Sequence, residues 1–157
     1  MIREGVTLVI VDMQPDLPAS NAEWLRSAVH DQIMTARSED WGIVILEYMH
    51  VDPPRTFGDT YQNLVSAANG NYDQFAMRAK MVLDGSERVE DACAEKQLPT
   101  QRFRVCGVNT HACIQRTVDG LAERFPDSII EVVGHACNDY NGNNWANFKL
   151  LSNVQVV

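Results

Sequence analysis

The sequence predicts a three-layer α/β/α fold on a mainly parallel, Rossmann-like sheet of about five to six strands. Short continuous runs of apolar and β-branched residues, such as residues 7–11 and 42–48, are typical of strands buried on both faces of a sheet. These runs alternate with helical patterns, which is typical of right-handed βαβ units with helices on both faces. No linker or repeat divides the 157 residues, so residues 1–157 are expected to form a single domain.

The first helix is expected over residues 20–37. Ser20 and Glu23 have the spacing of a capping box, in which each side chain bonds the backbone of the other residue. Apolar residues then recur at helical spacing, so one face of this helix should pack on the sheet. The strand expected at residues 7–11 is followed by an acid, Asp12, and by a loop with two prolines that leads to this helix, and the strand expected at 42–48 comes after the helix.

The rest of the chain continues the same alternation of strands and helices, with glycine and proline between them. The expected elements are a loop at 49–60, a short helix at 61–68, a short strand near the end of 74–82, a helix from 84 to about 96, a strand at 103–106, a helix at 114–124, a strand at 129–133, a helix at 143–151 and a last strand at 154–157. Each βα pair adds one strand whose carboxyl end opens on a loop.

Composition and charge restrict the class of partner. The formal net charge is -8, and lysines and arginines are scattered singly, which argues against binding to nucleic acid or to an anionic membrane. The apolar run near the N-terminus is too short to span a membrane and lacks the layout of a signal peptide, so a cytoplasmic protein is expected. The four cysteines have irregular spacing, which suggests neither a disulfide framework nor a structural zinc site. A small-molecule substrate is the expected partner.

Three polar or reactive residues follow separate strands. Ligands bind at the carboxyl ends of strands in open α/β sheets, which directs attention to Asp12, Lys80 and Cys113. Cys113 stands where a strand, a turn and the start of a helix meet, and the N–H groups and dipole of a helix N-terminus favour a thiolate. The alternative for Cys113 is an inert buried thiol, since free cysteines are among the most buried residues.

Three stretches resemble the isochorismatase-like cysteine hydrolases, the superfamily that includes nicotinamidases and N-carbamoylsarcosine amidohydrolases. They are Leu8-Val9-Ile10-Val11-Asp12-Met13-Gln14, then Lys80, then Val105-Cys106-Gly107-Val108-Asn109-Thr110-His111-Ala112-Cys113-Ile114. The order of elements is similar along essentially the whole chain. The resemblance implies hydrolysis of a carbon–nitrogen bond of the amide type, and family members are commonly homo-oligomers, so a homo-oligomer is expected.

The resemblance also assigns roles to individual residues. It implies a catalytic triad of Asp12, Lys80 and Cys113, an oxyanion hole formed by the backbone N–H groups of Asn109 and Cys113, and a cis peptide bond between Val108 and Asn109. The substrate pocket is expected to draw on five further residues. They are Gln14, Tyr48, Phe57, His111 and His135.

The chemistry of a thiol agrees with such a triad. Lowering a cysteine pKa by about two units requires roughly 2.7 kcal/mol of stabilisation of the thiolate, whereas a helix N-terminus usually supplies only ~0.3–1 kcal/mol. The Lys80 ammonium is the natural source of the remainder, and Asp12 can hold that ammonium and accept the thiol proton. The sequence therefore predicts a Cys113 pKa below the ordinary value.

The loop after the second strand departs from the pattern of the metal-binding nicotinamidases. His50 stands where the first metal-binding histidine of those enzymes is expected, but Tyr48 replaces the aspartate and Thr56 the second histidine. A lone histidine is a poor metal site, so neither a metal nor another cofactor is expected. Two alternatives stay open at this point: a catalytically idle binding or scaffold protein on the same fold, and an isochorismatase-type vinyl ether hydrolase.

Overall fold

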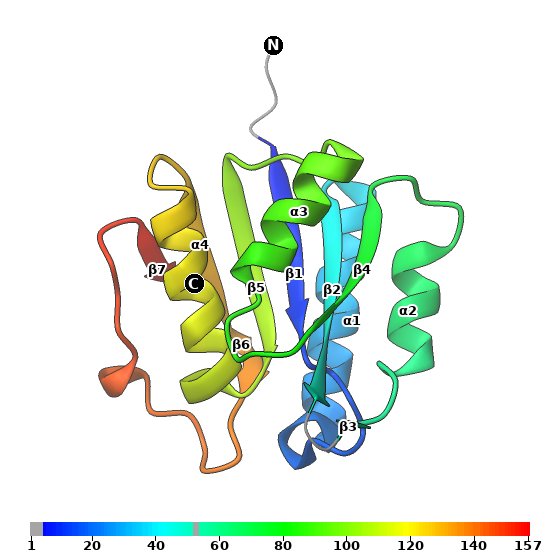
Figure 1. The fold of residues 1–157 in the computed structure, drawn as a ribbon, viewed down its shortest axis with the longest axis vertical. Coiled ribbons are helices and arrows are strands. Elements are labelled where there is room, and N and C mark those ends of the chain that lie inside the picture. The colour runs from blue at the N-terminus through cyan, green and yellow to red at the C-terminus, as the bar shows by residue number, and fades with distance from the viewer. Residues whose placement is uncertain (1–4, 52–53) are drawn as a thin grey trace.

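A computed structural model describes residues 5–51 and 54–157, in which seven strands form one sheet (Figure 1). Six of them are parallel, in the order β4-β2-β1-β5-β6-β7, and β3 pairs antiparallel with the end of β2. The strands are β1 (Val6–Val11), β2 (Gly42–Val51), β3 (Pro54–Thr56), β4 (Phe75–Lys80), β5 (Arg102–Val108), β6 (Ile129–Asn138) and β7 (Val154–Val156). The fold class predicted from the sequence is confirmed.

Helices cover both faces of this sheet. α1 (Glu23–Ser38) and α2 (Gln62–Asn69) lie on one face, and α3 (Ser86–Lys96) and α4 (Gln115–Arg124) lie on the other, in front of the strands in Figure 1. Alternate residues of a strand point to opposite faces. Leu8 of β1 accordingly packs in the cluster under α1, whereas Val9 packs in the cluster under α3 and α4. No helix of the described residues is long and apolar enough to cross a membrane.

Several predicted boundaries change in the structure. The capping box is wrong, because α1 begins after Ala22 without a side-chain cap, and the Ser20 hydroxyl donates to the Gln14 carbonyl oxygen 2.5 Å away. β2 and β6 extend beyond their predicted ends, and the loop predicted at 49–60 contains part of β2 and all of β3, with residues 52 and 53 outside the described residues. The other predicted strands and the helices at 61–68 and 84–96 are confirmed within a few residues.

The helix predicted at 143–151 is wrong. Only a short 3-10 turn, Trp145–Asn147, forms there, and most side chains around it are exposed. Phe148 is the buried residue of this stretch, and one buried side chain gives no apolar stripe that could hold a longer helix on the sheet. Asparagine also prefers turns, because its side chain bonds nearby backbone groups instead of continuing a helix.

The carboxyl ends of β1 and β5 approach each other closely at one glycine. Gly107 of β5 lies opposite Val11 of β1 with φ +121°, and a Cβ on Gly107 would stand 2.1 Å from the Val11 carbonyl oxygen. The next residue of β1, Asp12, has φ 54°, a left-handed conformation that is uncommon for residues other than glycine. Such conformations concentrate at functional sites.

Candidate active site

Asp12, Lys80 and Cys113 meet at the carboxyl edge of the sheet. The Lys80 Nζ lies 3.0 Å from Asp12 Oδ2 and 3.4 Å from Cys113 Sγ, although the three residues are 33 and 68 positions apart in the sequence. All three are buried, with exposed fractions of 1% for Asp12, 1% for Lys80 and 6% for Cys113. The structure thus brings together the three residues that the strand-end argument selected.

The sheet order explains how the lysine reaches the acid. β4 and β1 lie on either side of β2, and neighbouring strands are about 4.8 Å apart, so the Lys80 side chain must cross the end of β2. Tyr48, the partner of Lys80 in the β2–β4 register, lies under that path with its ring centroid 4.5 Å from Nζ. The Val82 carbonyl oxygen, 3.3 Å away, accepts a further hydrogen bond from Nζ. The ammonium is therefore held from three sides.

Burial governs the protonation of the site. Burial raises the pKa of the Asp12 carboxyl, and the positive charge of Lys80 opposes that rise. Burial and then the nearby negative charge of Asp12 raise the pKa of the Cys113 thiol to about 12, against the pull of Lys80. The expectation of a lowered Cys113 pKa is not met, because loss of solvation and the facing carboxylate outweigh the lysine. The isolated protein therefore holds Cys113 as a thiol.

The nucleophile turn, Thr110–Ile114, is a single π-helical turn that runs directly into α4. The backbone N–H groups of Ala112 and Ile114 both donate to the Asn109 carbonyl oxygen, at 3.1 Å each, which closes the turn around Cys113. The peptide bond between Val108 and Asn109 is cis, as the resemblance implied. Cys113 thus lies in the first turn of a continuous helix, a position where N–H groups can face a developing negative charge.

Two predicted pocket residues form one aromatic wall of the site. The rings of Tyr48 and Phe57 stack with centroids 5.1 Å apart and planes 11° apart, and both side chains are partly exposed. Gln14 lies behind this wall instead of facing a substrate. Its amide nitrogen donates to the carbonyl oxygens of Tyr48 and Gly58 and its amide oxygen accepts from the Tyr48 N–H, so both ends of the amide are bonded to the backbone. Gln14 holds the wall in place.

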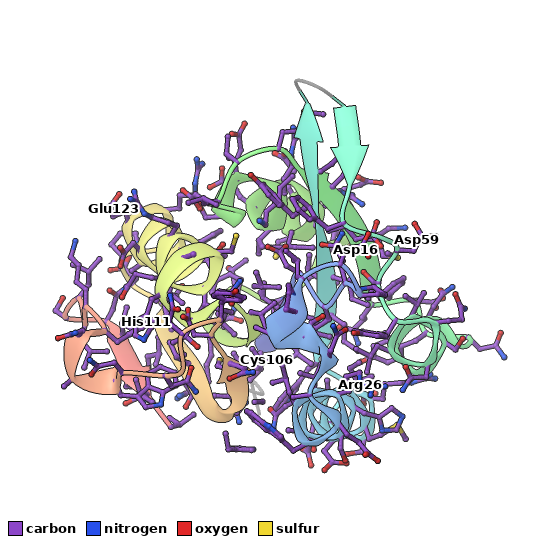
Figure 2. All side chains as sticks on the ribbon, turned by 90° about the horizontal axis from the view of Figure 1, so that it is seen from below. Asp16, Arg26, Asp59, Cys106, His111 and Glu123 are labelled. Carbon is purple, nitrogen blue, oxygen red and sulfur yellow. The ribbon has the colours of Figure 1, made fainter. Side chains whose placement is uncertain are left out.

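The two predicted histidines do not face the triad. Figure 2 shows His111 at the start of α4, beside the chain that follows β6, and His111 Nε2 accepts a hydrogen bond from the Asn144 N–H at 2.8 Å. His111 lines a surface cavity of about 410 Å³ that none of the triad residues lines. His135 is exposed in an irregular part of β6, where the register with β5 shifts.

Comparison with solved structures identifies the architecture. No protein-family model and no curated protein matches the sequence. A nicotinamidase/pyrazinamidase from Bacillus subtilis matches the fold with a TM-score of 0.77 at 15% identity, over 97% of this chain and 98% of that one. The chain has the isochorismatase-like fold.

Two other structures with the isochorismatase-like fold are similar over nearly their whole length. An N-carbamoylsarcosine amidase from Thermoplasma acidophilum has a TM-score of 0.75 at 15% identity, over 97% of this chain and 95% of that one. An isochorismatase family protein from Burkholderia thailandensis has a TM-score of 0.76 at 11% identity, over 99% and 92%. At these identities the likeness concerns the fold, so the chemistry has to be argued from the site itself.

On this isochorismatase-like fold, the described residues contain no group of three or more histidine, cysteine, aspartate or glutamate side chains that could hold a metal ion. The His50 side chain, which the sequence singled out as a lone histidine, and the side chain of Thr56 lie outside the described residues. The described donor set around the triad is one carboxylate, one ammonium and one thiol, and the ammonium is within hydrogen-bond distance of the other two.

One part of the site escaped the sequence analysis. Asp139 and Asn143, in the loop after β6, hydrogen-bond the nucleophile turn, yet this stretch was predicted partly as helix. The available signal was composition: Asn-Asp-Tyr-Asn-Gly-Asn-Asn, from residue 138 to 144, is dense in residues that bond the backbone in turns. That density indicates a structured loop, but the sequence does not say which backbone the loop binds.

Proposed function

We propose that the protein is a metal-independent cysteine hydrolase that cleaves a carbon–nitrogen bond of the amide type in a small molecule, through a thioester on Cys113. The observation that carries this proposal is the position of the Lys80 ammonium, within 3.4 Å of both the Asp12 carboxylate and the Cys113 sulfur. A buried cation beside a thiol stabilises the anion that forms when the thiol gives up its proton. An idle or scaffold protein would have no need of this arrangement.

In the first step, Cys113 Sγ attacks the carbonyl carbon of the amide while its proton passes to Asp12. Lys80 occupies Asp12 Oδ2, and among the described residues Oδ1 has no hydrogen-bond partner, so Oδ1 is available to accept that proton. The raised pKa of Asp12 makes its carboxylate a stronger base than an exposed one. The new S–C bond forms as the C=O π electrons move to oxygen, and the backbone N–H groups of Asn109 and Cys113 stabilise this oxyanion.

In the second step, the C–N bond breaks and the oxyanion reforms a carbonyl, which leaves a thioester. Asp12 gives its proton to the departing nitrogen, so an amine or ammonia leaves in neutral form. Asp12 then takes a proton from a water molecule that attacks the thioester. The C–S bond breaks as the carbonyl reforms, and Asp12 returns the proton to the Cys113 sulfur, so the products are a carboxylic acid and the free thiol. Lys80 keeps Asp12 in place through both steps and offsets the negative charge that passes between oxygen and sulfur.

The fold and the wall of the site support the same reaction class. The similar structures include an enzyme named as a nicotinamidase/pyrazinamidase and one named as an N-carbamoylsarcosine amidase, both of which act on carbon–nitrogen bonds. The stacked rings of Tyr48 and Phe57 offer a flat apolar surface beside Lys80, suited to a small planar amide. A vinyl ether hydrolase would leave the thiol at Cys113 without a role.

A panel of small amides, carbamoyl amino acids and ureido compounds, scored for ammonia release, tests the proposal. At least one compound should be cleaved, a metal chelator should leave the rate unchanged, and Cys113→Ala should abolish the activity. Cys93→Ala is the matched control, because Cys93 is also buried but lies in α3, and this variant should stay active. Full activity of Cys113→Ala would exclude the thioester mechanism.

The pH profile of the cleaved compound gives a second test. Asp12 must be ionised to accept the thiol proton, and burial raises its pKa above the ordinary value of 3.8. The rate should therefore fall on the acid side at a pH above 3.8, and Asp12→Asn should remove most of the activity at every pH. If the residual activity of Asp12→Asn falls at the same acidic pH as the wild-type activity, the group that titrates there is not Asp12.

A further inference from the structure

The loop at residues 139–144 holds the nucleophile turn by side-chain hydrogen bonds. The Asp139 carboxylate is buried, and its Oδ1 accepts from the His111 N–H at 2.9 Å. The Thr110 hydroxyl donates to Asn143 Oδ1 at 2.5 Å. Successive residues of the turn are thus tied to different residues of one loop, although the two segments are about 30 positions apart in the sequence.

Two further bonds extend this attachment on either side. Asn109 Oδ1 accepts from the Tyr140 N–H at 2.7 Å, and His111 Nε2 accepts from the Asn144 N–H at 2.8 Å. Asn109 is also the residue whose carbonyl oxygen closes the π-helical turn and whose N–H is assigned to the oxyanion hole. The side chains of Asn109 and His111, and the backbone N–H of His111, therefore all bond the loop.

The loop itself is braced against the sheet. Asp139 Oδ2 accepts from the Asn141 N–H at 3.0 Å, and Asn143 Nδ2 donates to the Cys137 carbonyl oxygen at 2.9 Å. Cys137 lies in β6 and pairs with Gly107 of β5, the glycine that lies against the Val11 residue preceding Asp12. Through β6 and β5, the loop and the nucleophile turn are therefore connected to β1, the strand that positions Asp12.

We propose that Asp139 and Asn143 are positioning residues that fix the nucleophile turn, so that Cys113 faces Asp12 and Lys80 and the N–H groups of Asn109 and Cys113 face the oxyanion. The inference rests on the proposed function for its effect on turnover. A displacement of about 1 Å at a reacting group can cost on the order of a hundredfold in rate, so a rigid attachment of this turn has a direct consequence for catalysis. Neither residue touches the triad, so both act through the turn.

Two measurements with opposite expected signs test this role. In Asp139→Ala the turn should loosen, so hydrolysis of the compound cleaved in the amide panel should fall at least about tenfold in kcat with little change in KM. Alkylation of Cys113 by iodoacetamide at pH 8 should rise at least about tenfold, because the thiol gains solvent and its pKa moves down from about 12. Asn143→Ala should change both rates in the same directions.

Asn153→Ala is the matched control, because it removes side-chain hydrogen bonds that are made outside the loop at 139–144 and outside the nucleophile turn. Asn153 Nδ2 donates to the carbonyl oxygens of Ala122, Phe125 and Ser128, at the far end of α4 from Cys113. Its loss should lower the free energy of unfolding without changing kcat or the alkylation rate. Asp139→Asn should restore part of the wild-type behaviour, because its amide oxygen can still accept from the His111 N–H.

The outcomes separate the inference from the proposed function. If Asp139→Ala and Asn143→Ala alkylate at the rate of Asn153→Ala, the positioning role is wrong, whether or not an amide is cleaved. If no compound of the panel is hydrolysed but both variants alkylate faster than wild type and Asn153→Ala, the proposed reaction is in error and the attachment of the turn stands. Should Asp139→Ala fail to fold, Asn143→Ala and Asp139→Asn carry the same comparison.

Discussion

The two halves of the candidate site are held in different ways. Asp12 follows β1 and Lys80 is the last residue of β4, and the register of the parallel strands together with one ion pair of 3.0 Å places them. Cys113 belongs to a turn that lies outside the sheet, and hydrogen bonds between this turn and the loop that contains Asp139 and Asn143 hold it. The acid–lysine half is therefore a product of the sheet, and the nucleophile half depends on a loop.

This difference has an energetic side. The acid and the lysine are nearly free of solvent contact, so each requires the other as a partner for its charge. Hydrogen bonds hold the turn: the neutral ones each contribute about 0.5–1.5 kcal/mol, and the bond to the Asp139 carboxylate contributes about 1.5–3 kcal/mol. Substitutions in the acid–lysine half should therefore lower both stability and activity, whereas substitutions in the loop that holds the nucleophile turn should lower mainly activity.

The largest effect is expected for Lys80→Met. Removal of the ammonium leaves Asp12 as an unpaired buried carboxylate, which should cost about 3–5 kcal/mol of unfolding free energy. Activity should fall by about a thousandfold or more, because the thiolate and Asp12 lose their counter-charge. Denaturant unfolding and amide hydrolysis measure the two effects. Lys96→Met, in the last turn of α3, is the control and should change neither by much.

A change at Gly107 should break the contact between the two halves. In Gly107→Ala, the added Cβ would stand 2.1 Å from the Val11 carbonyl oxygen, and residue 107 would keep its φ of +121°. The ends of β1 and β5 must therefore move apart, at a cost of about 3 kcal/mol or more of unfolding free energy. Gly142→Ala is a matched control with φ +82° and open space around the Cβ, which should cost about 1 kcal/mol. Equal losses of stability in the two variants would show that the close approach has no energetic weight.

A smaller and more selective effect is expected for Gln14→Met. The variant keeps the volume but removes the hydrogen bonds of Gln14 to the Tyr48 N–H and to two carbonyl oxygens, which should cost about 1–3 kcal/mol. Because the Tyr48–Phe57 wall would shift while the triad keeps its contacts, KM should rise more than kcat falls. A drop in kcat alone would contradict the placement of Gln14 behind the wall. Steady-state kinetics on a cleaved amide decide this.

The smallest effect concerns stability at alkaline pH. Burial raises the pKa of the Cys106 thiol from 9.0 to about 12, so the folded protein keeps a proton that the unfolded chain loses near pH 9. The stability from this thiol is complete below pH 9 and is lost as the pH rises toward 12, by on the order of 1–3 kcal/mol at pH 11. Cys106→Ala should show a shallower fall in unfolding free energy between pH 8 and 11. An unchanged slope would count against burial of this thiol.

The sequence predicted the site residues that lie at the ends of strands, and it missed the loop whose side chains bond the nucleophile turn. Asp12 and Lys80 could be placed because a strand end is visible in the hydrophobic pattern and the edge of a parallel sheet is shared. The hydrogen bond between Thr110 and Asn143 could not be predicted, because a contact between a turn and a loop leaves no periodic signal in the sequence. The pKa of Cys113 was predicted in the wrong direction for a related reason: burial of the thiol, and then the negative charge of the facing Asp12, raise this pKa, and both are properties of the folded chain.

The most direct test of the central claim is the mass of Cys113 during turnover. Protein mixed with a cleaved amide and quenched in acid should yield a peptide in which Cys113 carries the acyl group, and hydroxylamine should remove that mass. The acyl group should be absent from Cys113→Ser, whose hydroxyl is a far weaker nucleophile at this site. Turnover at the wild-type rate in a variant without the thiol, or an acyl group on a residue other than Cys113, would contradict the account.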